Sequence, residues 1–121
     1  MALLESGEMY LETILILSGS IERVRSIDVG EYMGFSKPSV SRAMNNLRKD
    51  EYIETDDDGY IVLTKKGRSI AEKIYERHVV LTEFLKKLGI SDTTAVNDAC
   101  KIEHDISDET FNAIKDYLIK D

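Results

Sequence analysis

Three residues late in the chain have side chains that could bind a metal ion together. Cys100, Glu103 and His104 occupy positions i, i+3 and i+4 of a segment whose pattern predicts a helix, so their side chains should project from one face. A thiolate, a carboxylate and an imidazole can hold one divalent transition-metal ion, provided that another segment completes the coordination. The structural alternative is that Cys100 is a small buried hydrophobic residue next to two ordinary polar residues.

The composition is that of an ordinary globular protein. The 121 residues are 42% hydrophobic and 32% charged, and the single cysteine cannot form an internal disulfide. A lone thiol favours a reducing compartment, so we expect a cytoplasmic protein. The apolar run at residues 11–17 follows Glu5 and Glu8 and includes Glu12, whereas a signal peptide needs a basic flank and a membrane helix needs about 20 apolar residues. We therefore expect neither export nor membrane insertion.

The net charge of −7 is unevenly distributed. Residues 1–19 carry three acidic and no basic residues, residues 20–80 carry eleven of each, and residues 81–121 carry nine acidic and five basic residues. The middle of the chain is therefore neutral, with clustered basic side chains that could meet phosphates. These are Lys37, Arg42, Arg48, Lys49, Lys65, Lys66 and Arg68. The whole molecule should bind DNA weakly unless a ligand activates it.

The hydrophobic pattern predicts a mainly α fold with one small β-hairpin. Ser36 is the expected N-cap of a helix with Pro38 in its first turn, and the Asp-Gly pair at 58–59 between β-prone runs predicts a hairpin. The expected elements are helices at about 6–18, 26–34, 36–49, 64–88, 92–104 and 108–120, with the hairpin at about 52–63. Two short helices followed by a hairpin predict a winged helix-turn-helix over residues 1–72. A helical lobe over residues 73–121 would follow, with the roles of metal binding and dimerisation.

The third expected helix has the character of a DNA-reading helix. Its residues Val40, Met44 and Leu47 form an apolar stripe, and polar side chains that can bond bases or phosphates surround that stripe. Arg42 is the main candidate for base recognition. The candidate DNA-binding residues are Ser36, Lys37, Pro38, Ser39, Ser41, Arg42 and Asn45. The alternative is that they are solvated polar residues of an ordinary helix.

The tip of the expected wing is acidic. Residues Asp56 to Asp58 would repel DNA phosphates. We therefore expect wing contacts to come from the flanks of the hairpin or from Lys65 and Lys66.

Several motifs taken together resemble the metal-dependent repressors of the diphtheria toxin repressor and manganese transport regulator family. Each motif is weak alone, but the combination is specific and covers nearly the whole chain. The motifs are Glu8-Met9-Tyr10-Leu11-Glu12, Ser36-Lys37-Pro38-Ser39-Val40-Ser41-Arg42, Leu63-Thr64-Lys65-Lys66-Gly67, Arg77-His78, Ala99-Cys100-Lys101-Ile102-Glu103-His104 and Ser107-Asp108-Glu109. Some iron regulators of this family have a further SH3-like domain, and we expect this chain to be a short form without it.

The resemblance implies a ligand set for the metal. Its iron-responsive members imply one site made by Met9 together with Cys100, Glu103 and His104, whereas its manganese-responsive members use Glu12 and His78 in a paired site. This chain has all six residues. It departs from the iron-type pattern at Thr82, where a carboxylate is expected, and at Val96, where a ligand is often found.

The sulfur ligands favour Fe²⁺, Co²⁺, Ni²⁺ or Zn²⁺ over Mn²⁺. We expect Fe²⁺ as the metal, with Mn²⁺ second and Zn²⁺, Co²⁺ or Ni²⁺ able to bind in vitro. The expected function is thus a metal-dependent transcriptional regulator, by family a repressor, that binds a palindromic DNA operator as a homodimer and controls metal homeostasis. Two alternatives remain. The first is a metal-independent winged-helix regulator. The second is a metalloenzyme, which is disfavoured because the sequence shows no acid or base placed beside an open coordination position.

Overall fold

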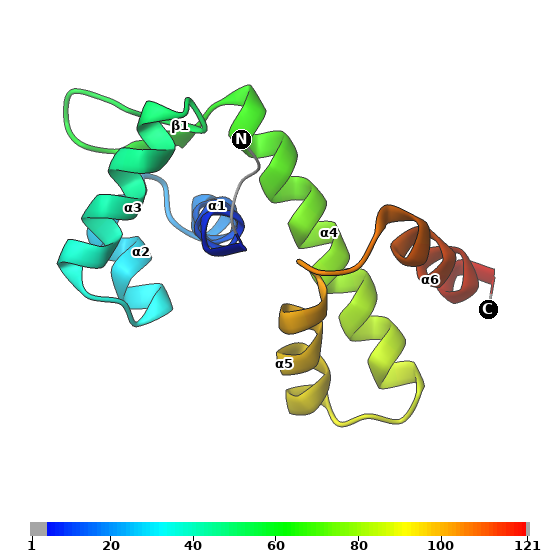
Figure 1. Cartoon of the computed structure of the whole chain (residues 1–121). Coiled ribbons are helices and arrows are strands. Elements are labelled where there is room, and N and C mark those ends of the chain that lie inside the picture. The colour runs from blue at the N-terminus through cyan, green and yellow to red at the C-terminus, as the bar shows by residue number, and fades with distance from the viewer. Residues whose placement is uncertain (1–4, 121) are drawn as a thin grey trace. The chain divides into compact units, whose positions relative to one another are not determined.

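The computed structural model describes residues 5–120 of the chain (Figure 1). The chain forms two compact units, Met1–Glu72 and Lys73–Asp121. Its elements are α1 (Glu5–Ser20), α2 (Ser26–Met33), α3 (Lys37–Lys49), β1 (Ile53–Thr55), β2 (Ile61–Leu63), α4 (Lys65–Lys87), α5 (Asp92–Ile102) and α6 (Asp108–Lys120). The predicted fold class, mainly α with a small hairpin, is confirmed. No helix within residues 5–120 combines the length and the apolar character needed to cross a bilayer.

In the first unit, α2 and α3 form a helix-turn-helix that packs on α1. Gly34 ends α2 in the left-handed conformation, with φ of +73°, which glycine adopts without steric cost. Ser36 is the N-cap of α3, as predicted: its Oγ accepts the backbone N–H of Ser39 at 3.3 Å. Pro38 lies in the first turn, where its missing N–H costs no helical hydrogen bond.

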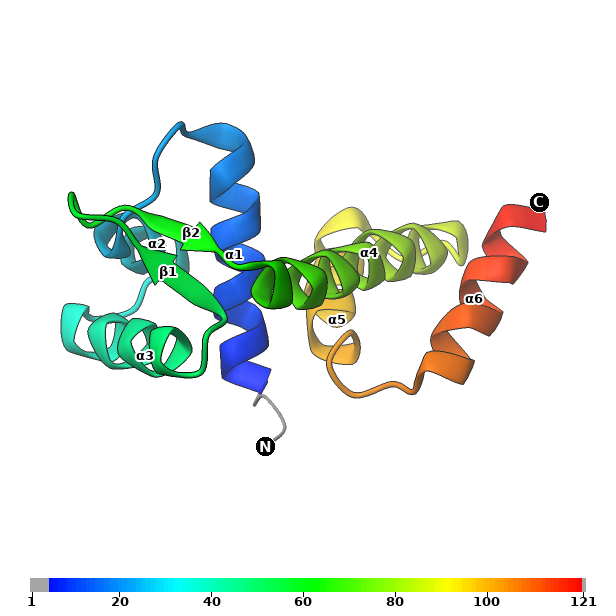
Figure 2. The ribbon, with the colours of Figure 1, turned by 90° about the horizontal axis from the view of Figure 1, so that it is seen from above.

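The strands β1 and β2 pair antiparallel and form the wing (Figure 2). Asp56 organises the turn, because its Oδ1 accepts the backbone N–H groups of Asp58 at 2.9 Å and Tyr60 at 3.0 Å. An isolated antiparallel bridge joins Val24 to Ile61, with the Ile61 N–H donating to the Val24 carbonyl at 2.7 Å. The segment before α2 is therefore bonded to the wing.

One hydrophobic core holds the elements of the first unit together. Its side chains come from α1, α2, α3, the hairpin and the first turns of α4, and it places the exposed face of α3 relative to the wing. The core residues are Tyr10, Leu11, Ile14, Val24, Val29, Val40, Met44, Leu47, Tyr52, Ile53, Ile61, Leu63 and Ala71.

The start of α4 is bonded to the base of the wing. Thr64 caps the helix by accepting the Gly67 N–H at 3.1 Å, and it donates its hydroxyl to the Glu51 carbonyl at 2.7 Å. Gly67 packs directly on the backbone, because a Cβ at this position would lie 2.0 Å from the carbonyl oxygen of Tyr52. Only glycine fits this approach without a backbone shift.

In the second unit, α5 and α6 lie beside the C-terminal half of α4 (Figures 1 and 2). Lys115 of α6 pairs with Glu76 of α4 at 2.8 Å, and the ring of Tyr117 stands edge-on to that of Phe84 with centroids 6.2 Å apart. The unit has a small apolar interior that includes Leu81, Ala95, Ala99 and Phe111.

The predicted extent of the fifth helix needs a correction. We expected helix to His104, but α5 ends at Ile102 and Glu103 is its C-cap. Glu103 keeps helical dihedrals, φ −58° and ψ −24°, and its N–H bonds to the Ala99 carbonyl at 3.0 Å. Cys100 and Glu103 thus retain helical spacing, whereas His104 lies in the turn that follows.

Candidate metal centre and nucleic-acid interface

A cluster of potential metal ligands lies within the second unit. His78 of α4, Cys100 of α5 and Glu103 each offer one ligand atom, and these atoms lie within 4.8 Å of one another. The Nδ1 of His78 is 2.9 Å from Oε2 of Glu103. Cys100 is exposed, so the alternative that it is a small buried hydrophobic residue is wrong. Nitrogen, sulfur and oxygen donors together suit a divalent transition metal.

Burial of Glu103 shows that these residues fit a cation. Its side chain is 0% exposed, and its Oε1 accepts no hydrogen bond from the described residues. The Nε2 of His104, itself 1% exposed, is 3.4 Å from that oxygen. A carboxylate removed from water is costly unless its charge is compensated, and a divalent cation at this cluster would provide that compensation.

Arg77 organises the turn that carries Glu103 and His104. Its guanidinium is buried, donates to the carbonyls of Glu103 at 3.1 Å and Ile106 at 2.8 Å, and pairs with Asp108. These bonds satisfy carbonyls that no longer have helical partners after α5 ends. Sequence reasoning missed this role, and the only signal was the adjacency of Arg77 to the predicted ligand His78.

Asp108 is held by two cations. The hydrogen bonds from Lys73 and then Arg77, with their positive charges, hold the pKa of Asp108 below its ordinary value of 3.8. The start of α6 is thereby tied to α4 by charge-assisted contacts.

The other predicted ligands lie in the first unit. Met9 is half-buried and Glu12 is buried, and both belong to α1. The structure thus brings together His78, Cys100 and Glu103, places His104 beside Glu103, and leaves the roles of Met9 and Glu12 as predictions.

The predicted DNA-reading helix has the expected division into two faces. Its apolar stripe, Val40, Met44 and Leu47, is buried in the core. The exposed residues of the predicted set are Ser36, Lys37, Pro38, Ser41, Arg42 and Asn45. Ser39 is half-buried and its hydroxyl lies 3.0 Å from that of Ser36, so these two serines stabilise the start of α3.

Arg42 is electrostatically linked to α1. Burial raises the pKa of Tyr10, and the positive charge of Arg42 opposes that increase. Tyr10 follows Met9 in the sequence and packs edge-on to Phe35, with ring centroids 5.9 Å apart. The helix that carries a predicted metal ligand therefore lies near the main candidate for base recognition.

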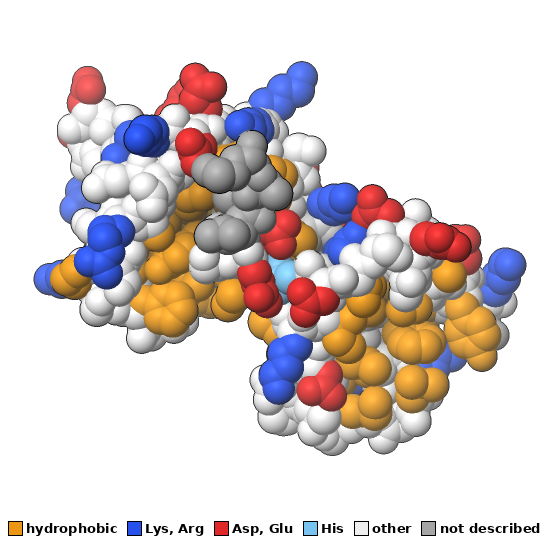
Figure 3. Space-filling view, in the orientation of Figure 1, with side chains coloured by type: hydrophobic (Ala, Val, Ile, Leu, Met, Phe, Trp, Pro, Cys, Tyr) orange, Lys and Arg blue, Asp and Glu red, His pale blue; other side chains and the backbone are white. Residues whose placement is uncertain are grey.

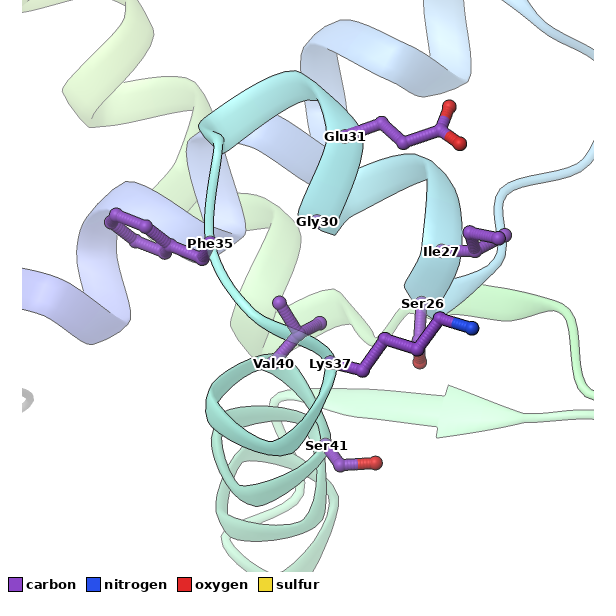
Figure 4. Close-up of a pocket in the computed structure, with 8 residues that line it drawn as sticks. All are labelled: Ser26, Ile27, Gly30, Glu31, Phe35, Lys37, Val40 and Ser41. Atoms are coloured by element: carbon purple, nitrogen blue, oxygen red, sulfur yellow. The ribbon is translucent and has the colours of Figure 1, made fainter.

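A pocket of about 470 Å³ lies beside the exposed face of α3 (Figure 4). Its apolar lining is Ile27, Gly30, Phe35 and Val40, and its polar lining is Ser26, Glu31, Lys37 and Ser41. Lys37 extends from the first turn of α3 toward the start of α2, whereas Glu31 points away (Figure 4). The N-terminal ends of α2 and α3 thus share one surface.

Two of the basic residues near the wing have internal partners. Lys66 donates to the Asp50 carbonyl at 3.1 Å and lies over the Tyr52 ring. Arg48 donates to Thr55 at 2.9 Å and to Asn45 at 2.8 Å. Arg48 thus joins α3 to β1, and Lys66 joins the start of α4 to the segment between them. These contacts reduce the number of basic side chains available for phosphates.

Comparison with known proteins identifies the family. Residues 2–67 match the iron dependent repressor N-terminal DNA binding domain. The chain belongs to the iron-dependent repressor family. Residues 64–120 match the metal binding and dimerisation domain of the same family, and the resemblance found in the sequence is confirmed.

Solved structures show the same fold. The manganese regulator SloR superposes with a TM-score of 0.83 at 28% identity, covering 93% of this chain and 53% of that one. A manganese-dependent transcriptional repressor in complex with manganese superposes with a TM-score of 0.85 at 26% identity, covering 93% of this chain and 52% of that one. A hypothetical protein, SSo2273 of Sulfolobus solfataricus, shares the fold at a TM-score of 0.73 and 22% identity, with 98% and 92% covered. The chain therefore spans about half the length of the first two proteins.

Proposed function

We propose that this protein is a metal-activated transcriptional repressor that binds a palindromic operator as a homodimer and controls metal homeostasis. The observation that carries the proposal is the cluster of His78, Cys100 and the buried carboxylate of Glu103. The same chain also has a winged helix-turn-helix. The manganese complex of a structurally similar repressor supports a divalent metal as the activator.

Fe²⁺ is the proposed metal and Mn²⁺ the second choice. Cys100 contributes a soft thiolate, which favours Fe²⁺, Co²⁺, Ni²⁺ or Zn²⁺ over Mn²⁺. Glu103 contributes a hard oxygen and the histidines contribute borderline nitrogens, so Mn²⁺ remains acceptable. Because Cys100 must lose its proton to ligate, metal affinity should rise with pH. The bound ion would supply positive charge and fixed ligand directions, whereas the residues of the cluster determine which ion is retained.

Met9 and Glu12 are proposed as further ligands on the strength of the family resemblance. Both belong to α1, the helix on which the helix-turn-helix packs. Ligation by either residue would make metal binding and DNA binding stabilise each other, because two ligands that favour the same conformation are thermodynamically linked.

The second unit has an apolar surface suited to a two-fold dimer. Orange side chains gather over this part of the molecule in Figure 3. In α6, Phe111 is buried and Tyr117 is 62% exposed. The large hydrophobic side chains exposed in this unit are Tyr75, Val79, Leu88, Val96, Tyr117 and Ile119. A dimer would present two α3 helices to successive turns of the major groove, about 34 Å apart.

The test is anaerobic DNA selection with chelated protein, alone and with Fe²⁺, Mn²⁺ or Zn²⁺ added at fixed salt. A randomised duplex pool supplies the operator, and sedimentation reports the oligomeric state. We expect a palindrome to be enriched only with metal, most strongly with Fe²⁺. The variants C100A and H104A should remain folded and lose the metal response, whereas E109Q, which removes an exposed charge outside the cluster, should keep it.

Two outcomes separate this proposal from its alternative. Sequence-selective binding that is indifferent to every metal would favour a metal-independent winged-helix regulator. Full metal activation in both C100A and H104A would show that the cluster is not the sensing site.

A further inference from the structure

Two arginines before α2 are held beside the wing by the backbone. Val24 is 2% exposed and bridges to Ile61 of β2, whereas Arg23 and Arg25 on either side of it are exposed. Side chains alternate between the two faces of an extended segment. Because Val24 points into the core, both arginines must point away from it, onto the outer surface of the wing.

The ring of Tyr60 holds both guanidinium groups. The Cζ atoms of Arg23 and Arg25 lie 5.0 Å and 4.5 Å from the ring centroid, within the range of a cation–π contact. Arg25 also donates from Nη2 to the Tyr60 hydroxyl at 3.0 Å. Two positive charges would ordinarily repel each other, so their attachment to one ring indicates a preorganised site for an anion.

The carboxylates near this cluster have other hydrogen-bond partners or line a pocket beside it. Asp28 accepts the backbone N–H of Arg25 at 2.9 Å, and one oxygen of Asp56 accepts two backbone N–H groups of the wing turn. Glu22 and Asp56 line a neighbouring pocket of about 390 Å³ with Arg23. Among residues 5–120, no carboxylate lies close enough to Arg23 or Arg25 to form a salt bridge.

The cluster lies next to the surface that α3 presents. Arg25 immediately precedes Ser26, which lines the same pocket as Lys37 and Ser41 of α3 (Figure 4). Arg25 is also the N-cap of α2, and the helix dipole favours negative charge at this end, where Asp28 already bonds the Arg25 N–H. Tyr60, in turn, belongs to the wing. Arg25 therefore links the wing, through Tyr60, to the segment that begins α2.

We propose that Arg23 and Arg25, held across the Tyr60 ring, bind a backbone phosphate of duplex DNA beside the groove that receives α3. This inference rests on the proposed function. It assigns to the segment before α2, beside the wing, a phosphate contact that the acidic tip of the wing, Asp56 to Asp58, cannot make. The contact is independent of sequence, so it should contribute to affinity and its salt dependence and leave operator choice to α3.

The test measures DNA affinity against salt concentration for the wild type and R23Q/R25Q. The probe is the duplex enriched by the wild type, with whichever of Fe²⁺, Mn²⁺ or Zn²⁺ activates it. K86Q/K120Q removes the same charge from the second unit and is the matched control. The R23Q/R25Q slope of log K against log salt should be shallower by about 0.9 for each phosphate lost, or roughly two for a dimer. The control should keep the wild-type slope.

Variants of Tyr60 test whether DNA affinity depends on the ring that holds the two arginines, and not only on their charge. Y60L keeps both arginines and should lower the affinity for DNA. Y60F keeps the ring, so its affinity should stay closer to that of the wild type. The operator sequence should be unchanged in all variants. An R23Q/R25Q slope equal to that of the wild type would overturn this inference alone. Failure of the wild type to bind DNA with any metal would overturn the proposed function together with it.

Discussion

Replacement of Glu103 by Gln should have opposite effects on the metal-free and the metal-loaded protein. The side chain is 0% exposed and its Oε1 accepts no hydrogen bond from the described residues. Burial of an ion costs several kcal/mol after relaxation. The contact with His78 at 2.9 Å returns about 1.5–3 kcal/mol of that cost. Gln preserves the shape and removes the charge, so metal-free E103Q should be more stable than the wild type by about 1–3 kcal/mol.

The metal should reverse this order. At a free-ion concentration about 1,000 times Kd, binding stabilises the wild type by about 4.1 kcal/mol. E103Q should lose most of that gain because an amide is a poor ligand for a transition metal. The assay is urea denaturation at pH 8, above the ordinary pKa of an imidazole, in chelator and then in excess Mn²⁺, with E109Q as the control. The reasoning would be refuted by an E103Q protein that is less stable without metal and is still fully stabilised by it.

Three further substitutions test the fold around the two sites. G67A should destabilise the first unit by about 2–4 kcal/mol, because its Cβ would lie 2.0 Å from the Tyr52 carbonyl oxygen; a change below about 0.5 kcal/mol in urea denaturation would contradict the packing. M44A should cost about 2–5 kcal/mol, since this side chain is 1% exposed in the core, and calorimetry should show a lower Tm. The lowered pKa of Asp108 means that the unfolded chain binds more protons at low pH, so stability is lost as the pH falls below about 3.8. D108N should therefore lose less stability between neutral and acid pH than the wild type does, as measured by urea denaturation. An unchanged dependence on pH would show that the Asp108 contacts do not contribute to stability.

Features set by neighbouring residues were predictable from the sequence. Ser36 followed by Pro38 specifies the start of α3, because a hydroxyl three residues before a helical N–H can cap it and proline cannot sit deeper in the helix. The Asp-Gly pair at 58–59 specified the wing turn in the same local way. The end of α5 was less predictable, because the carbonyls beyond Ile102 find their partner in Arg77, on another helix.

By itself, the sequence determined the order of elements, the buried stripe of α3 and the pairing of Cys100 with Glu103, since helical periodicity and capping act over only a few residues. Only the tertiary structure decided which distant groups meet. His78 joins Glu103 from 25 positions away and Arg25 meets Tyr60 across 35, because the packing of one element on another, and not the spacing along the chain, sets those distances.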